Sequence, residues 1–235
     1  MMTWRCIMKK LLVSACLFSV LSIQPLHSEA ASYSKKIKQD FTIYDQAKKK
    51  YTVSMRSSKA SCHKATSNDI WWIKGKDELC SGKFVLYLNG KSTNYKYTYT
   101  KSNPYVFSTT DAKTSAVLKN KTGYPTVFSL TNKETYSFLN LKTYTVLNKK
   151  LTKQSNTLTS YAIKPKMNGN LVQAPIYDNG GYGFGYVFND LTVSGTKWID
   201  ERSHDYISQD PNSKRYKNGV SEMKKYQNSL SYFVK

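Results

Sequence analysis

The sequence predicts a mainly antiparallel β protein that ends in a short α-helix. Runs of strand-forming residues with alternating polarity recur along the chain, and turn residues separate them. Apolar residues at helical spacing are found at the C-terminal end. Short strands at regular spacing are typical of β-sandwiches and β-propellers. We therefore expect a small or incomplete β-propeller-like array, with a β-sandwich as the alternative.

Residues 1–30 have the pattern of a secretory signal peptide. Two lysines precede an apolar run over Leu11–Ile23, and Ser28–Ala30 supplies the small residues that a signal peptidase recognises. The apolar run is too short to span a bilayer. We therefore predict a secreted protein without a transmembrane segment, in which residues 31–235 form a single β domain, free or associated with the cell wall.

The predicted mature part is strongly basic. It contains 33 basic and 14 acidic residues, so its formal charge is 33 − 14 = +19, and only three of the basic residues are arginines. Such a charge attracts polyanions. Lysine lacks the bidentate fork with which arginine recognises phosphate and base edges, which argues against specific nucleic-acid binding. An anionic cell-wall polymer or polysaccharide is the expected partner, and solubility alone is the alternative explanation.

The first strands of the mature part are expected at Phe41–Tyr44 and Tyr51–Met55, where strand formers gather. The segment Ser57–Asn68 is small and polar, and it is expected to be a loop. Trp71 and Trp72 then lie within an apolar tetrapeptide that suggests a short buried strand. If the two indole rings were exposed instead, they could bind a carbohydrate.

Cys62 and Cys80 are the two cysteines of the mature part, and they are 18 residues apart. In an exported protein, a pair of cysteines without an odd partner most simply forms one disulfide. The alternatives are free thiols, or a metal site that also uses His63. Zinc requires four ligands, or three and a water, and no second Cys/His cluster supplies them. We therefore predict the disulfide and no metal or other cofactor.

A row of tyrosines follows a predicted hairpin turn. Asn89–Gly90 indicates a two-residue turn, because a type I′ turn requires positive φ at both central residues. Tyr95, Tyr97 and Tyr99 then alternate with polar residues and must share one face of a strand. Such a row either forms one side of a core or binds sugar rings. A carbohydrate-binding module would require at least two of these rings, or the two tryptophans, to be exposed and coplanar.

The clearest strand pair lies in Gly123–Leu151, with a polar turn after Leu130 and another at Asn148–Lys150. Similar units begin at Asp40, Gly82 and Gly169, so the steps between the four starts are 42, 41 and 46 residues. Steps of this size are found between propeller blades. Residues of both parities in the second strand are apolar or strand-forming: Tyr136, Phe138, Tyr144 and Val146 on one, and Leu139, Leu141, Thr143 and Thr145 on the other.

The pattern Gly-x-Pro-x-Val, followed by Tyr-x-Val-Leu-Asn-x-Lys-Leu, occurs in Gly123–Leu151. It resembles the propeller-type repeats of exported Bacillus-like proteins, many of which have no assigned activity. The resemblance therefore implies a fold and no particular reaction. The Asp-x-Asp-x-Asp loop of calcium-binding propellers is absent, so calcium binding is not implied.

The densest acidic cluster, Asp200–Asp205, contains His204. A hydrolase needs an acid–base pair of this kind, so His204 with Asp205 or Glu201 is the candidate catalytic group. Charge compensation on a loop is the alternative. The chain has no nucleophile elbow, HExxH zinc motif, CxxC pair or dinucleotide-binding fingerprint. These absences favour a non-enzymatic protein, with a secreted hydrolase as the alternative.

The C-terminal end is expected to form a helix that begins near Ser221 and packs on the sheet, or lies on an anionic membrane. Its apolar residues recur at near-helical spacing. Together, these observations predict a monomeric, non-enzymatic binding protein of the cell envelope or the extracellular space. The apolar residues of the predicted helix region are Val220, Met223, Leu230 and Val234.

Overall fold

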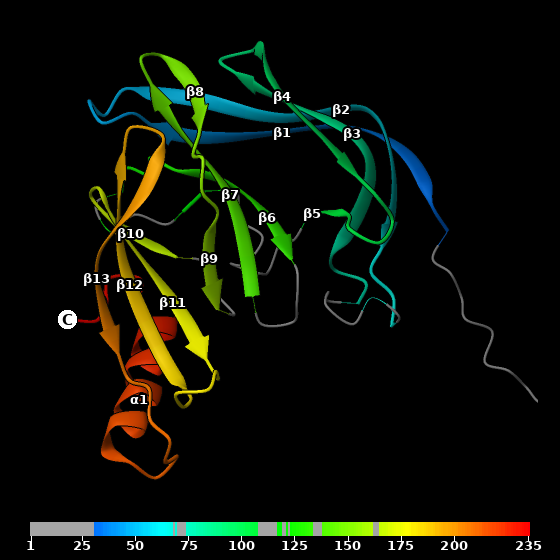
Figure 1. Ribbon diagram of the computed structural model, residues 1–235. Coiled ribbons are helices and arrows are strands. Elements are labelled where there is room, and N and C mark those ends of the chain that lie inside the picture. Colours follow the sequence, from blue (N-terminus) through cyan, green and yellow to red (C-terminus); the bar gives the residue numbers. More distant parts are fainter. Residues whose placement is uncertain are drawn as a thin grey trace, which may run out of the picture.

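A computed structural model describes residues 31–67, 69, 74–107, 117–118, 121, 123–133, 138–161 and 165–235. Within this part, the chain forms three antiparallel sheets and one C-terminal helix (Figure 1). The prediction of a mainly antiparallel β protein with one short C-terminal helix is therefore confirmed. The predicted signal peptide and the segment with Trp71 and Trp72 lie outside the described residues.

Sheet A is formed by the first five strands, in the order β1-β2-β3-β4, with β5 also pairing with β3. Its first two strands are longer than expected. The predicted loop Ser57–Asn68 is wrong as far as Lys64, because β2 has a pairing partner on each side that holds a polar stretch in an extended conformation. The strands are β1 (Tyr33–Tyr44), β2 (Lys50–Lys64), β3 (Glu78–Leu88), β4 (Lys91–Tyr99) and β5 (Tyr105–Phe107).

A β-bulge interrupts β2. Between Arg56 and Ala60, β2 has one residue more than the facing part of β3. Gly82 lies at this point with φ +135°, and an added Cβ would come within 3.2 Å of the carbonyl oxygen of Lys59. The close approach of the two strands therefore requires glycine at this position.

The predicted disulfide between Cys62 and Cys80 is confirmed. The two residues lie directly opposite each other on β2 and β3, beyond the bulge, and both are fully buried. The bond engages both sulfur atoms, so the alternatives of free thiols and of a metal site with His63 are wrong. The bulge divides the pairing of β2 with β3 into two parts. The bridge fixes the part that contains Cys62 and Cys80.

Sheet B is formed by the region in which the clearest strand pair was predicted. Its order is β6-β7-β8, and β9 also pairs with β7. Tyr144 and Val146 of β7 belong to a core shared with sheet A, whereas Leu139 and Leu141 belong to a core shared with the third sheet. The predicted separation of β7 into two faces is therefore confirmed for these residues. The strands are β6 (Phe128–Lys133), β7 (Phe138–Leu147), β8 (Lys150–Lys153) and β9 (Leu158–Tyr161).

Sheet C is a meander with the order β10-β11-β12-β13. β11 pairs with the short β10 only as far as Gln173, so Pro175 lies where β11 has one hydrogen-bonded neighbour. This agrees with the expectation that proline marks an edge position. The strands are β10 (Lys166–Asn168), β11 (Leu171–Asp178), β12 (Gly185–Ser194) and β13 (Lys197–Asp205).

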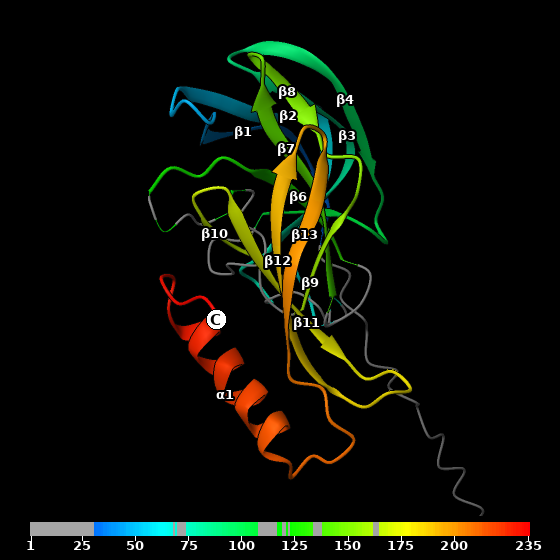
Figure 2. The same ribbon diagram turned by 60° about the vertical axis from the view of Figure 1, so that its left-hand side comes forward.

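The C-terminal helix, α1, extends over Lys214–Asn228 and lies beside sheet C (Figure 2). The predicted start near Ser221 is wrong, because Ser213 is the N-cap and its side chain accepts a hydrogen bond from the backbone N–H of Tyr216 at 3.2 Å. The buried face contains Met223 and Tyr226 and packs against Phe188 of β12. In the described part of the chain, no helix is long and apolar enough to cross a bilayer.

The propeller-like arrangement is not confirmed. Asp40 and Gly82, two of the four starts of the proposed repeat, lie inside β1 and β3 of the same sheet. Gly123 precedes β6, and Gly169 lies in the turn between β10 and β11. The starts are therefore not equivalent positions of successive blades. Instead, the described sheets share cores in sequence: A with B, B with C, and C with α1.

We expect reduction of the disulfide to lower the free energy of unfolding by on the order of 3 kcal/mol, because the closed loop restricts the unfolded chain. Urea unfolding with and without reductant measures the difference. The variant with both Cys62→Ala and Cys80→Ala serves as the control, since reductant should not change its unfolding midpoint. An unchanged midpoint for the reduced wild-type protein would contradict the prediction.

Candidate functional site

The three predicted catalytic candidates on β13 are not brought together. His204 Nε2 lies 3.1 Å from Asp190 Oδ2 on the neighbouring strand β12. Asp205 instead forms an exposed ion pair with Arg215 at 3.1 Å, and Glu201 accepts a hydrogen bond from Thr192 Oγ1 at 2.5 Å. Because neighbouring residues of a strand point to opposite faces, Asp205 points away from the side on which His204 meets Asp190. Glu201 lies at a β-bulge of β13, where the register with β12 shifts, and its hydrogen-bond partner is Thr192 and not His204.

Asp190 is the acidic residue that sequence reasoning missed. It is fully buried and accepts hydrogen bonds from Gln173 Nε2 at 2.7 Å and from Arg202 Nε at 2.6 Å. Burial alone would raise its pKa, but the hydrogen bonds from Arg202, Gln173 and His204 outweigh burial and hold the pKa of this carboxyl below its ordinary value. The sequence contains one sign that Asp190 is buried: it lies two residues after Phe188 on β12, and therefore on the same face of the strand as this buried aromatic residue.

The same buried cluster holds the C-terminal segment. Gln173 Nε2 donates to the carbonyl of Val234 at 3.0 Å, and Gln173 Oε1 accepts from the Val234 N–H at 2.9 Å. The hydroxyl of Tyr226 on α1 donates to the backbone carbonyl of Gln173 at 2.5 Å. Buried Lys166 donates through Nζ to the carbonyls of Tyr226 and Ser229, at the C-terminal end of α1.

These contacts assign a structural role to the cluster around Asp190. Its carboxylate is engaged by three side chains from β11 and β13, and Gln173 connects it to the last residues of the chain. A partner that is removed from such a cluster leaves a buried charge or donor unpaired, which is costly. The histidine that suggested a hydrolase is therefore part of the link between sheet C and the C-terminal segment.

We expect Asp190→Asn to lower the free energy of unfolding by about 3 kcal/mol near neutral pH, because it removes a buried, paired charge. The pKa of Asp190 is lower in the folded than in the unfolded state. Its stabilising contribution is therefore complete above an unfolded pKa of about 4 and is lost as the pH falls through the folded pKa. Urea unfolding at about pH 7 and about pH 3 should show the difference from wild type shrinking in acid.

The control for this prediction is Glu201→Gln, on the neighbouring strand β13 and exposed. It should change the free energy of unfolding by less than about 0.5 kcal/mol. An equal loss for Asp190→Asn at both pH values would rule out the proposed contribution of the carboxylate charge.

The predicted tyrosine row lies on one face of β4 and packs against the core shared by sheets A and B. The ring of Tyr95 lies 5.1 Å from that of buried Tyr144, and its hydroxyl accepts a hydrogen bond from the backbone N–H of Lys153 at 3.0 Å. Tyr97 and Tyr99 are tilted by 44° to each other, and burial raises the pKa of Tyr97 to about 12. The row is therefore half-buried core, and Tyr97 and Tyr99 do not form the coplanar platform that sugar stacking requires.

The opposite face of sheet A carries a row of cationic residues. Strand pairing places Lys38 of β1 beside Arg56 of β2, then Val85 of β3, then Lys96 of β4. The guanidinium carbon of Arg56 lies 4.2 Å from the ring centroid of Tyr87, which holds the side chain along the sheet. We call the exposed face that carries Lys38, Arg56, Lys83 and Lys96 the outer face of sheet A.

The positive charge is unevenly distributed along the chain. Residues 31–107, which contain sheet A, have fifteen basic and five acidic residues, a difference of +10. Residues 165–235, which contain sheet C and α1, have nine basic and seven acidic residues, a difference of +2. Residues 108–164, which contain sheet B, have nine basic and two acidic residues, a difference of +7. The electrostatic attraction for a polyanion is therefore weakest in the segment that contains sheet C and α1 and strong in the two segments that precede it.

Among the described residues, no group of three or more His, Cys, Asp or Glu side chains is arranged so that it could hold a metal ion. The chain matches no protein-family model, no curated protein and no solved structure. Its function must therefore be inferred from its own surfaces and cavities, of which the outer face of sheet A carries the clearest chemical character.

Proposed function

We propose that the protein is a secreted, non-enzymatic binding protein of the cell envelope, which associates with anionic wall polymer through the outer face of sheet A. The observation that carries the proposal is the cationic row across β1, β2 and β4. The predicted signal peptide supports secretion, and the disulfide between Cys62 and Cys80 is of a kind that persists in oxidising compartments.

The geometry of the row suits an extended anionic chain. Neighbouring strands are about 4.8 Å apart, so Lys38, Arg56 and Lys96 cover about 14 Å across the sheet. Lys83 lies on the same face as Val85 and adds a further charge. Asp40 offsets part of this charge, since its carboxylate lies 3.2 Å from Lys38 Nζ. A polymer with regularly spaced phosphates or carboxylates could contact several of these cations at once.

The chemistry of lysine favours attraction to the overall charge of a polymer over recognition of its particular repeating unit. Each exposed lysine–anion contact contributes little, but several together give binding that weakens steeply as salt rises. The association would therefore be reversible and would depend on polymer charge more than on the identity of the repeating unit. This suits attachment to a wall surface without a reaction.

We expect the triple variant Lys38→Gln, Lys83→Gln, Lys96→Gln to bind teichoic-acid-bearing walls more weakly than wild type at low salt. The slope of log affinity against log salt concentration should become shallower by about two to three, because three cations no longer displace counterions. Sedimentation of purified protein with isolated walls over a salt series measures both quantities.

A second triple variant provides the control: Lys197→Gln, Lys217→Gln, Lys224→Gln, which removes the same charge from exposed positions of β13 and α1. It should lose much less affinity than the first variant. If the two variants lose equal affinity, total charge rather than the outer face of sheet A governs binding. If wild-type protein is retained equally at low salt and at about 0.5 M salt, the electrostatic proposal fails altogether.

A further inference from the structure

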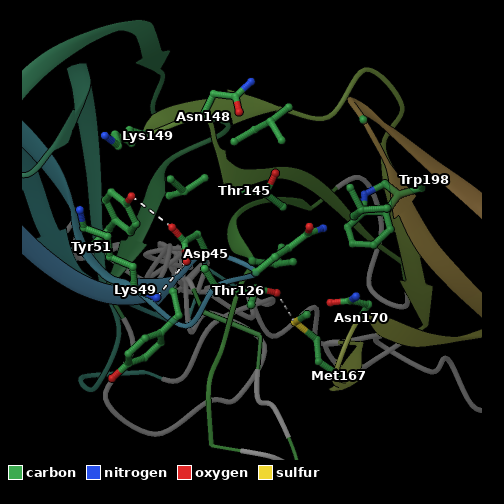
Figure 3. A pocket seen from close by; sticks show the side chains of 18 residues that line it. Asp45, Lys49, Tyr51, Thr126, Thr145, Asn148, Lys149, Met167, Asn170 and Trp198 are labelled. Carbon is green, nitrogen blue, oxygen red and sulfur yellow. Dashed lines mark hydrogen bonds between the residues drawn. The ribbon is translucent and has the colours of Figure 1, made fainter.

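A cavity of about 340 Å³ lies where hairpin turns of all three sheets meet (Figure 3). The β1–β2 turn contributes Asp45 and Lys49, and the β7–β8 turn contributes Asn148 and Lys149. Sheet C contributes Asn170 from the β10–β11 turn, and residues at and beside the β12–β13 turn. Rigid strands thus hold several turns around one space, an arrangement in which loops often carry binding residues.

The cavity has two chemically different walls, which Figure 3 shows on opposite sides. Asp45, Lys49, Tyr51 and Lys149 form the charged wall. The other wall is largely apolar and contains buried Trp198, whose Nε1 donates to Thr143 Oγ1 at 2.8 Å. Further apolar residues line the cavity, among them Val127, Val146 and Met167.

The single carboxylate of the charged wall already has partners. Asp45 Oδ1 accepts the N–H of Lys49 at 2.9 Å, and Asp45 Oδ2 accepts the hydroxyl of Tyr51 at 3.2 Å. Asp45 therefore stabilises the β1–β2 turn. The two exposed lysines, Lys49 and Lys149, leave the charged wall with a net positive charge.

The backbone at Lys149 is strained. Asn148 and Lys149 have φ of +49° and +63°, a pairing for which the second position favours glycine. A lysine there costs stability that glycine would not, and strained backbone of this kind is often found at binding sites. Lys48 has a nearly identical φ of +60°, but its Nζ lies over the ring of Tyr124 at 5.4 Å. Of these two lysines, Lys149 is the one that lines the cavity.

We propose that this cavity binds a small amphipathic anion, with its apolar body against Trp198, Met167 and Val146 and its anionic group beside Lys149 and Lys49. The volume is at the small end of the range for ligand pockets, which suits one short alkyl or aryl group with a single phosphate or carboxylate. The site is distinct from the outer face of sheet A and does not depend on the proposed wall binding.

Calorimetric titration with three probes tests both walls. Hexyl phosphate carries an apolar body and an anion, inorganic phosphate carries only the anion, and hexanol carries only the body. Hexyl phosphate should bind at least about tenfold more tightly than either of the others, because it contacts both walls. Equal affinity for inorganic phosphate, or no detectable binding of hexyl phosphate, would overturn the proposal.

Two matched variants test the position of the anion. Lys149→Gly and Lys48→Gly each relieve a positive φ and should raise the melting temperature by about 2–4 °C. Of the two variants, only Lys149→Gly removes a cation from the cavity. It should therefore weaken hexyl phosphate binding by about tenfold, whereas Lys48→Gly should leave the affinity unchanged. Lys149→Arg should keep the affinity. Unchanged affinity in Lys149→Gly, or an equal loss in Lys48→Gly, would show that the anion does not lie beside Lys149.

The two proposals can fail separately. The variant with Lys38, Lys83 and Lys96 replaced by glutamine should bind hexyl phosphate as wild type does, because none of these residues lines the cavity. A loss of hexyl phosphate binding in this triple variant would place the anion on the outer face of sheet A and overturn the cavity assignment, whatever the result with walls.

Discussion

The fold depends on one strand, β7, being buried on both faces. On one face, Tyr144 packs against Phe128, with ring centroids 5.8 Å apart, and against Tyr95 of sheet A. On the other face, Leu141 joins the core of sheet C, and Thr143 receives the indole N–H of Trp198. Because each face of β7 contributes to a different core, sheet B links the other two sheets, and a polar residue in place of Tyr144 or Leu141 would weaken one of these links.

Local features of the fold could be predicted from the sequence, whereas the assignment of strands to sheets could not. The Asn89–Gly90 turn and the two parities of β7 follow from rules that act within a few residues. The length of β2 depends instead on partners on both sides, which a polar sequence does not reveal. The start of α1 was missed because its first turn is polar, and Ser213 provided the only signal.

In the candidate sites, too, local features could be predicted from the sequence and contacts between distant segments could not. Composition predicted attraction to polyanions, but only strand register places Lys38, Arg56 and Lys96 in one row. The shared face of the tyrosines was predictable, but their burial depends on Tyr144, which is distant in sequence. His204 was paired with its sequence neighbours, although alternation along a strand separates neighbours and cross-strand pairing supplies Asp190. The cavity was not predictable, because turns from three sheets form it.

The uneven charge also gives the molecule an electrical polarity. The excess of basic residues is +10 in residues 31–107, which contain sheet A, +7 in residues 108–164, and +2 in residues 165–235, whose helix α1 lies at the bottom of Figure 1, away from sheet A. Near an extended anionic surface, such a distribution exerts a torque that turns the sheet A end toward the surface before contact. The helix would then point outward, so an adsorbed layer of this protein would present α1 and the C-terminal segment to its surroundings.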